Sequence, residues 1–156
     1  MNSDTHRSLE VVLEREIEAA RSLATTLEAE RAALTGSSPE AVIEKAAQKT
    51  ALLGVIDKLE MQRQALCQAA LITLPNMQRG RIPVVSGVSD AIADRWRDLL
   101  ELIAGCRIAN EVNGYIINAR RGQITQLFQA LRGGTPATYG PQGRLFNKSQ
   151  RALARA

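Results

Sequence analysis

Few side chains in this 156-residue chain have the type and spacing that chemistry requires. The only histidine is His6, which removes most acid–base and metal-binding schemes that depend on imidazole. Asp90, Asp94 and Asp98 are spaced for one face of a helix and resemble a weak cation site. Acidic residues in the first turns of a helix also interact favourably with its dipole, and we favour this structural interpretation.

The chain also lacks the sequence motifs of common enzymes. It contains no Gly-rich phosphate-binding loop, no GxSxG sequence and no CxxC pair. Cys67 and Cys106 both fall inside predicted helices, where a reduced and buried thiol is the expected state. We therefore expect no enzymatic activity, no catalytic residue, no metal and no cofactor, and a protein that acts by binding.

Charge is distributed unevenly along the chain. All 16 acidic residues lie at or before Glu111, whereas seven of the 20 basic residues follow it. A basic end of this kind indicates an anionic partner, a membrane surface or RNA, or else a solvated tail that favours solubility. Composition alone leaves these alternatives open.

The composition favours helices that pack through an aliphatic core. Hydrophobic residues make up 45% of the chain and aromatic residues only 3%, which suits helix packing better than a β-sandwich or barrel. Apolar residues recur at steps of three and four in segments that glycine and proline separate. This spacing predicts helices over about 4–35, 39–74 and 89–132.

The breaks between these helices suggest the domain organisation. Residues 36–39 combine a glycine helix end, a serine N-cap and a proline in the first helical position. The connector 75–88 is long for a helical hairpin, and 135–156 form a flexible basic tail after a helical domain at 1–134. We expect an all-α fold, an elongated up-down bundle or long α-hairpin of three long helices. The heptad-like seam of the third helix would also serve a coiled-coil homodimer.

The longest predicted helix carries a polar interruption on its apolar seam. Asn110 and Asn113 occupy seam positions, with Gly114 beside them. A polar seam residue costs stability but can fix register or oligomeric state, and it can also cap or bridge a neighbouring helix end. A third interpretation is that packing stops here, so that 89–109 hold the bundle together and 115–132 form a recognition surface.

Beyond the interruption, the same helix combines an apolar stripe with basic residues. Such a stripe can bind an amphipathic partner helix, although an ordinary bundle helix has the same pattern. The candidate binding residues are Ile117, Arg120, Ile124, Leu127, Phe128 and Leu131. Tyr139 lies between Gly- and Pro-rich flanks and is either an ordinary tail aromatic or an anchor with a large apolar ring and a polar tip.

Several short motifs of the chain resemble those of the FlgN-type flagellar export chaperones. They are Glu30-Arg31-Ala32-Ala33-Leu34, Glu44-Lys45 to Leu52-Leu53, Arg95-Trp96, Asn110-x-x-Asn113-Gly114 with Ile116-Ile117, and Tyr139-Gly140-x-x-Gly143. Each motif is short, but their order and spacing span nearly the whole chain. The connector at 75–88 is longer than this family pattern leads us to expect.

The resemblance implies a cytoplasmic type III export chaperone for hook-associated proteins, which form the hook–filament junction. The C-terminal third would bind the C-terminal helix of FlgK- and FlgL-like clients, prevent premature assembly and deliver them to the export gate in the inner membrane. A tail tyrosine, matched by Tyr139, would dock the complex on a membrane protein of that gate. No nucleic acid is expected in this interpretation. The alternative is a coiled-coil scaffold or regulator whose basic tail binds RNA or another polyanion.

Overall fold

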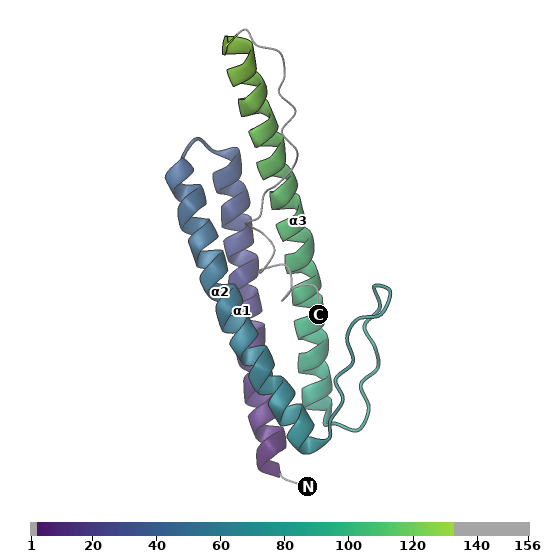
Figure 1. Cartoon of the computed structure of the whole chain (residues 1–156). Helices are drawn as coiled ribbons and strands as arrows, with labels where there is room; N and C mark the ends of the chain where they lie inside the picture. The colour runs from purple at the N-terminus through teal and green to yellow at the C-terminus, as the bar shows by residue number, and fades with distance from the viewer. Residues whose placement is uncertain (1–2, 133–156) are drawn as a thin grey trace.

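The computed structural model describes residues 3–132, apart from the side chains of Ile124, Leu127 and Phe128. The described part consists mainly of three helices, α1 (Ser3–Thr35), α2 (Pro39–Ala70) and α3 (Asp90–Arg132). α1 and α2 form an antiparallel hairpin, and α3 runs in the same direction as α1 (Figure 1). α1 packs along both of its neighbours and is the central element. This arrangement confirms the predicted all-α bundle.

A tight turn joins α1 to α2 at the position that the sequence predicts. The Gly36 N–H donates to two carbonyls of the preceding turn, at 3.1 and 3.2 Å, and so closes the end of α1. Ser38 has an extended backbone, and its hydroxyl accepts a hydrogen bond from the Ala41 N–H at 3.3 Å as the N-cap of α2. Pro39 follows as the first residue of α2, where no helical hydrogen bond is lost.

The second helix ends about one turn earlier than predicted. α2 stops at Ala70, and Leu71 adopts a left-handed conformation with φ 54° and ψ 34°. The N–H groups of Leu71 and Ile72 donate to carbonyls of the last turn of α2, at 3.3 and 2.9 Å, and thereby satisfy them. The predicted end at residue 74 is therefore wrong. A left-handed cap usually carries glycine, and a leucine there leaves no signal in the sequence.

The connector between α2 and α3 packs against the bundle and runs beside the first turns of α3 (Figure 1). Trp96 Nε1 donates to the Pro75 carbonyl at 2.8 Å and holds the start of the connector. Gln78 and Arg81 form an isolated pair at its tip, with backbone hydrogen bonds of 3.1 and 2.9 Å. Its apolar side chains contact the core through Ile72, Leu74, Met77, Ile82, Val85 and Val88.

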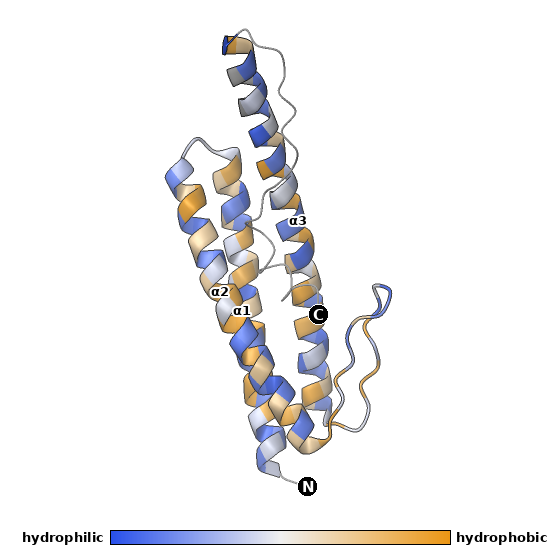
Figure 2. Ribbon diagram, viewed as in Figure 1, coloured by the Kyte–Doolittle hydropathy of each residue, from blue (hydrophilic) through white to orange (hydrophobic). Residues whose placement is uncertain are grey.

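Two apolar clusters follow one another along α1. The first joins α1 to the start of α3 and contains Leu9, Leu13, Ile17, Ala20, Ile92, Trp96, Leu99 and Leu100. The second joins all three helices and contains Ala19, Leu23, Leu27, Leu53, Ile56, Leu59 and Cys106. Figure 2 shows hydrophobic positions recurring along each helix between hydrophilic ones. Together the clusters set the position of α3, which continues past the α1–α2 turn.

Candidate functional site

Four polar side chains from the three helices meet inside the bundle. Lys49 of α2 donates to Glu30 Oε1 of α1 at 2.7 Å and to Asn110 Oδ1 of α3 at 3.3 Å. Asn113 of α3 donates through Nδ2 to Glu30 Oε2 at 2.8 Å. Glu30 is 1% exposed and Asn113 is fully buried. Because both carboxylate oxygens have a donor, the buried charge is compensated. We call these four residues the polar cluster.

Asn113 also ties α3 directly to the end of α1. Its Nδ2 donates a second hydrogen bond to the Leu27 carbonyl at 2.9 Å, and its Oδ1 accepts one from Arg31 Nε at 3.1 Å. Both ends of the amide are therefore used against the last turns of α1. Asn113 therefore bridges α3 to the last turns of a neighbouring helix, whereas Asn110 contacts Lys49 in the interior of α2. Glycine at position 114 is not required for close packing against another element, because a Cβ there would meet nothing within 4 Å.

The packed bundle continues past the asparagines. Ile117 is half-buried, and Arg120 Nη2 donates to the Gly36 carbonyl of the α1–α2 turn at 3.1 Å. This contact lies about two helical turns beyond the polar cluster. The predicted boundary, with 115–132 outside the bundle, therefore needs correction. The part of α3 beyond the turn begins at Arg121.

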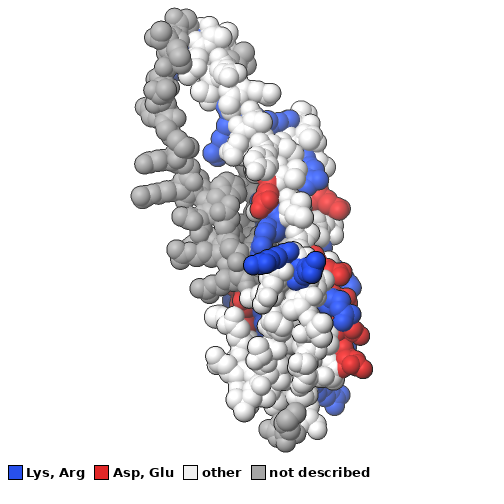
Figure 3. All heavy atoms as spheres, turned by 90° about the vertical axis from the view of Figure 1, so that its right-hand side faces the viewer, with Lys and Arg blue, Asp and Glu red and all other residues white. Residues whose placement is uncertain are grey.

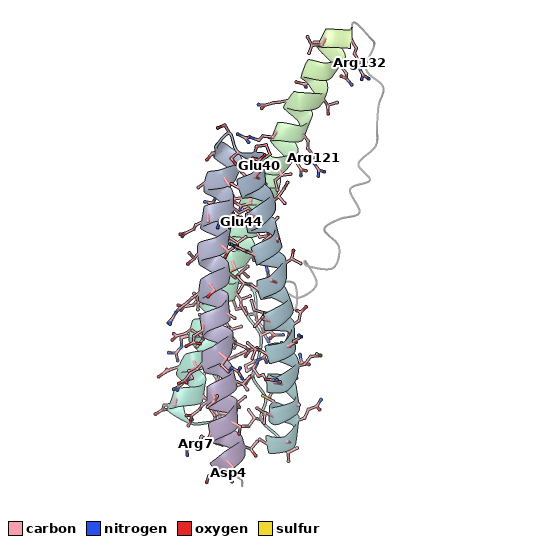
Figure 4. The ribbon with its side chains drawn as sticks, turned by 90° about the vertical axis from the view of Figure 1, so that its left-hand side faces the viewer. Asp4, Arg7, Glu40, Glu44, Arg121 and Arg132 are labelled. Atoms are coloured by element: carbon pink, nitrogen blue, oxygen red, sulfur yellow. The ribbon has the colours of Figure 1, made fainter. Side chains whose placement is uncertain are left out.

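From Arg121 to Arg132, α3 projects past the end of the α1–α2 hairpin (Figure 1). This length corresponds to about 18 Å of helix. We call residues 121–132 the projecting segment. Figure 4 shows Arg121 close to the hairpin end and Arg132 at the tip. Both arginines are exposed, as is Leu131 with 75% of its surface in solvent.

The predicted binding residues occupy the base and the length of this segment. Ile117 and Arg120 lie at its base beside the α1–α2 turn, and Leu131 lies near its tip. The backbone is also helical at the three intermediate positions, Ile124, Leu127 and Phe128. Tyr139 lies outside the described residues. The role of these side chains in binding stays a prediction.

A groove of about 440 Å³ opens where the projecting segment leaves the bundle. Its mostly apolar lining includes Leu34, Pro39, Val42 and Ile43 from the hairpin and Ile117, Arg120 and Arg121 from α3. Ile43 is 69% exposed at its edge. Sequence reasoning missed the contribution of α2, because Val42 and Ile43 stand far from Ile117 in the chain and no local pattern connects them.

Charge is sparse and basic on the α3 side of this end of the bundle. Among the described residues, none after Glu111 is acidic, whereas Arg120, Arg121 and Arg132 follow it. Figure 3 shows Lys and Arg without Asp or Glu on the upper part of one face, and a mixture of both signs below. The site therefore combines an apolar groove with a positive border.

A second charged group lies between the polar cluster and the opposite end of the bundle. Arg63 Nε donates to both carboxylate oxygens of Glu16, at 3.2 and 3.0 Å, and its guanidinium carbon lies 4.6 Å from the centre of the Trp96 ring. Burial raises the pKa of Glu16, and the charge and hydrogen bond of Arg63 oppose that shift. Arg63 also lies 4.0 Å from Glu60, three residues earlier on the same helix, in a longer contact. This group joins the three helices and is structural.

The candidates for metal binding are not brought together in the described part of the chain. Among residues 3–132, no three His, Cys, Asp or Glu side chains are placed to hold a metal ion. Asp94 pairs with Arg97 at 3.0 Å on the exposed first turns of α3.

In the part of the chain that the structure describes, none of the helices has the length and apolar character needed to span a bilayer.

Comparison with known protein families matches residues 1–146 to the family model described as FlgN protein. No curated protein and no solved structure matches the chain. The matched range contains all three helices, the polar cluster, the groove and the projecting segment. It also contains Tyr139, the predicted docking residue.

Proposed function

The chain belongs to the FlgN family of flagellar export chaperones, and from this premise we propose that its clients are FlgK- and FlgL-like hook–filament junction proteins. Members of this family are chaperones, not enzymes, and their partners are hook-associated proteins of the flagellum. Within this role, we place the client grip in the C-terminal third of the chain. The complex then forms in the cytoplasm and travels to the export gate.

The projecting segment is the observation that carries this proposal. Residues 121–132 extend beyond the hairpin, so neither α1 nor α2 lies beside this part of α3 (Figure 1). An amphipathic client helix can pack against these positions as a helix on a helix. Arg121 and Arg132 would meet acidic side chains of that client at the border of the contact.

Binding alone is sufficient for a chaperone of this kind. A client helix that is held against α3 cannot pair with other copies of the client, so premature assembly is suppressed in proportion to the bound fraction. Release at the gate requires a partner that favours the unbound state or binds the emptied chaperone more tightly. No covalent step is needed at any point.

We test the client grip by co-purification with hook-associated proteins from the same bacterium. Full-length chaperone should capture a junction protein, and a truncated chain of residues 1–121 should not. The truncation keeps the polar cluster and the Arg120–Gly36 contact, so circular dichroism should still show a folded bundle. Failure of the full-length chain to capture any junction protein would refute the proposal, and capture by the truncated chain would place the site elsewhere.

Gate docking is a separate part of the proposal and depends on Tyr139. We expect Tyr139→Ala to keep client capture and to lose binding of the chaperone–client complex to the cytoplasmic part of the export-gate membrane protein. Tyr139→Phe should retain most of that binding if the ring supplies the anchor. Equal loss of client capture and gate binding in Tyr139→Ala would contradict the division of roles.

The basic end of the chain supports a second candidate function, the binding of RNA or another polyanion. Seven basic and no acidic residues follow Glu111. Counterion release makes such binding fall steeply as salt rises, whereas an apolar helix-on-helix contact changes little. Titration of the full-length chain with single-stranded RNA at 50 and 200 mM salt decides between the two, with no tight binding expected at either.

A further inference from the structure

The groove and the projecting segment form one surface. Ile117 lines the groove, and positions 124 and 131 follow it at intervals of seven residues along the same helix. Residues at this spacing lie on the same face of a helix. A partner helix that lies along this face of α3 would therefore run into the groove, where Val42 and Ile43 of α2 stand opposite α3.

We propose that this groove is the second half of the client site. The client helix packs along α3, inserts an apolar side chain between Ile43 and Ile117, and places an acidic side chain beside Arg121. The inference rests on the proposed function and adds to it the first turn of α2, which then takes part in recognition.

The size of the groove fits this role. Its volume is about 440 Å³, and one turn of an α-helix, with a diameter of about 10 Å and a pitch of 5.4 Å, fills roughly 400 Å³. The groove can therefore hold one end or one turn of a helix while the rest lies on α3. An apolar anchor in such a pocket, with charged residues at the rim, is typical of the residues that dominate binding energy.

The charge of the groove lining indicates which kind of partner binds there. Arg120 and Arg121 are the charged residues of the groove lining, and the Arg120 guanidinium is held at the Gly36 carbonyl. Residues 133–156 of this chain carry only basic charges, so they and the groove repel one another. A second copy packed groove to groove would bring the same arginines face to face. An amphipathic helix with acidic residues beside its apolar stripe is the complementary partner.

The nearby acidic residues do not change this conclusion. Glu40 and Glu44 lie on the first turns of α2 (Figure 4) but outside the groove lining. Glu40 accepts a hydrogen bond from the Ser38 hydroxyl at 3.1 Å, and Glu44 accepts one from Gln48 at 3.1 Å. Both carboxylates are therefore engaged locally.

The test uses the full chain and a fluorescein-labelled peptide of the C-terminal amphipathic helix of a FlgK-like protein from the same bacterium. Fluorescence anisotropy should show at least tenfold weaker binding for Ile43→Asp and at least threefold weaker binding for Arg121→Glu. Met61→Asp is the matched control for the first, because Met61 is 65% exposed on the same helix but outside the groove lining. Arg7→Glu, at the opposite end of the bundle (Figure 4), is the control for the second. Both controls should bind within twofold of wild type.

The outcomes separate this inference from the proposed function. If Ile43→Asp and Arg121→Glu bind like their controls while the 1–121 truncation loses the peptide, the function stands and the groove is not part of the site. If the wild-type chain does not bind the peptide, both proposals fail. If a peptide of residues 133–156 displaces the client, or if Ile43→Asp turns a dimer into a monomer, the occupant is the chain itself and the inference is wrong. Equal thermal unfolding of variants and wild type excludes misfolding as the cause.

Discussion

The Asn113 side-chain amide donates to Glu30 Oε2 at 2.8 Å, and neither residue is more than 1% exposed. The other oxygen of the same carboxylate accepts a hydrogen bond from Lys49 at 2.7 Å. One buried carboxylate of α1 therefore holds α3 and α2 at once. A shift of α3 by one turn would leave that carboxylate short of a donor, so the polar cluster specifies the register of the bundle. The groove and the projecting segment take their positions from this register.

Replacing Asn113 by alanine should destabilise the bundle. The change leaves the buried Glu30 Oε2 without a donor, removes the second hydrogen bond of the Leu27 carbonyl and opens a small cavity. Buried polar groups without partners cost about 1–3 kcal/mol each, so we expect a loss of about 2–4 kcal/mol in the free energy of unfolding. Urea unfolding followed by circular dichroism measures it. The exposed Asn118 is the control, and Asn118→Ala should change stability by less than about 0.5 kcal/mol.

The Glu30–Lys49 pair predicts strong coupling between two substitutions. Lys49→Met removes the cation from a carboxylate whose side chain is 2% exposed, and we expect a loss of about 3–5 kcal/mol in the free energy of unfolding. The double variant with Glu30→Gln no longer buries a charge and should be more stable than Lys49→Met alone. A double-mutant cycle measures the coupling. Losses that simply add would show that the pair is not coupled.

Glu16 should make stability depend on pH. Burial raises its pKa above the usual 4.5 despite the nearby Arg63, so the folded state holds a proton more tightly than the unfolded state does. The contribution of Glu16 is therefore fully present below its unfolded pKa and is lost as pH rises through its folded pKa. Relative to Glu16→Gln, wild type should lose stability between about pH 4.5 and the folded pKa. Urea unfolding of both proteins from pH 3.5 to 7 measures this, and a wild type that gains stability relative to Glu16→Gln as the pH rises would contradict it.

Local sequence signals were sufficient to predict the turn between α1 and α2 but not the end of α2. Ser38 and Pro39 act on backbone groups within one turn, so their types alone predict where α2 begins. Leu71 ends α2 in a left-handed conformation that its side chain does not favour. The reason lies in tertiary packing, because the reversal lets Ile72 and Leu74 contact the first core cluster.

The contacts between helices could be identified only from the structure. Glu60 lies three residues from Arg63 on the same helix, a spacing that favours a local ion pair, but the main partner of Arg63 is Glu16 of α1. Asn110 and Asn113 are visible as polar seam positions, yet the Glu30 carboxylate, which contacts Asn113 directly and Asn110 only through Lys49, is one of many along α1. The groove combines segments of α2 and α3 that no periodicity relates. Burial and charge across the whole bundle decide which helix faces meet. The sequence of a single helix does not indicate its packing partners.

The two cysteines should differ sharply in reactivity. Cys106 is 1% exposed within the second core cluster, its thiol donates to the Ala20 carbonyl at 3.5 Å, and burial raises its pKa to about 11. At pH 8 only about one molecule in a thousand would carry the reactive thiolate, even before access is considered. Cys67 is half-buried, and burial raises its pKa as well.

Single-cysteine variants test this difference with a coloured disulfide reagent at pH 8. The thiol of Cys106 in the Cys67→Ser variant should react at least a hundredfold more slowly in the folded protein than in 6 M guanidinium, since reaction requires the bundle to open. The thiol of Cys67 in the Cys106→Ser variant should react faster than that of Cys106 in the folded state. If client peptide slows the reaction of Cys106 further, binding at the far end of α3 reduces opening of the whole bundle, as expected for a ligand that binds only the folded state. Rapid labelling of Cys106 in the native protein would show that the second core cluster opens readily and that α3 is not held as the polar cluster implies.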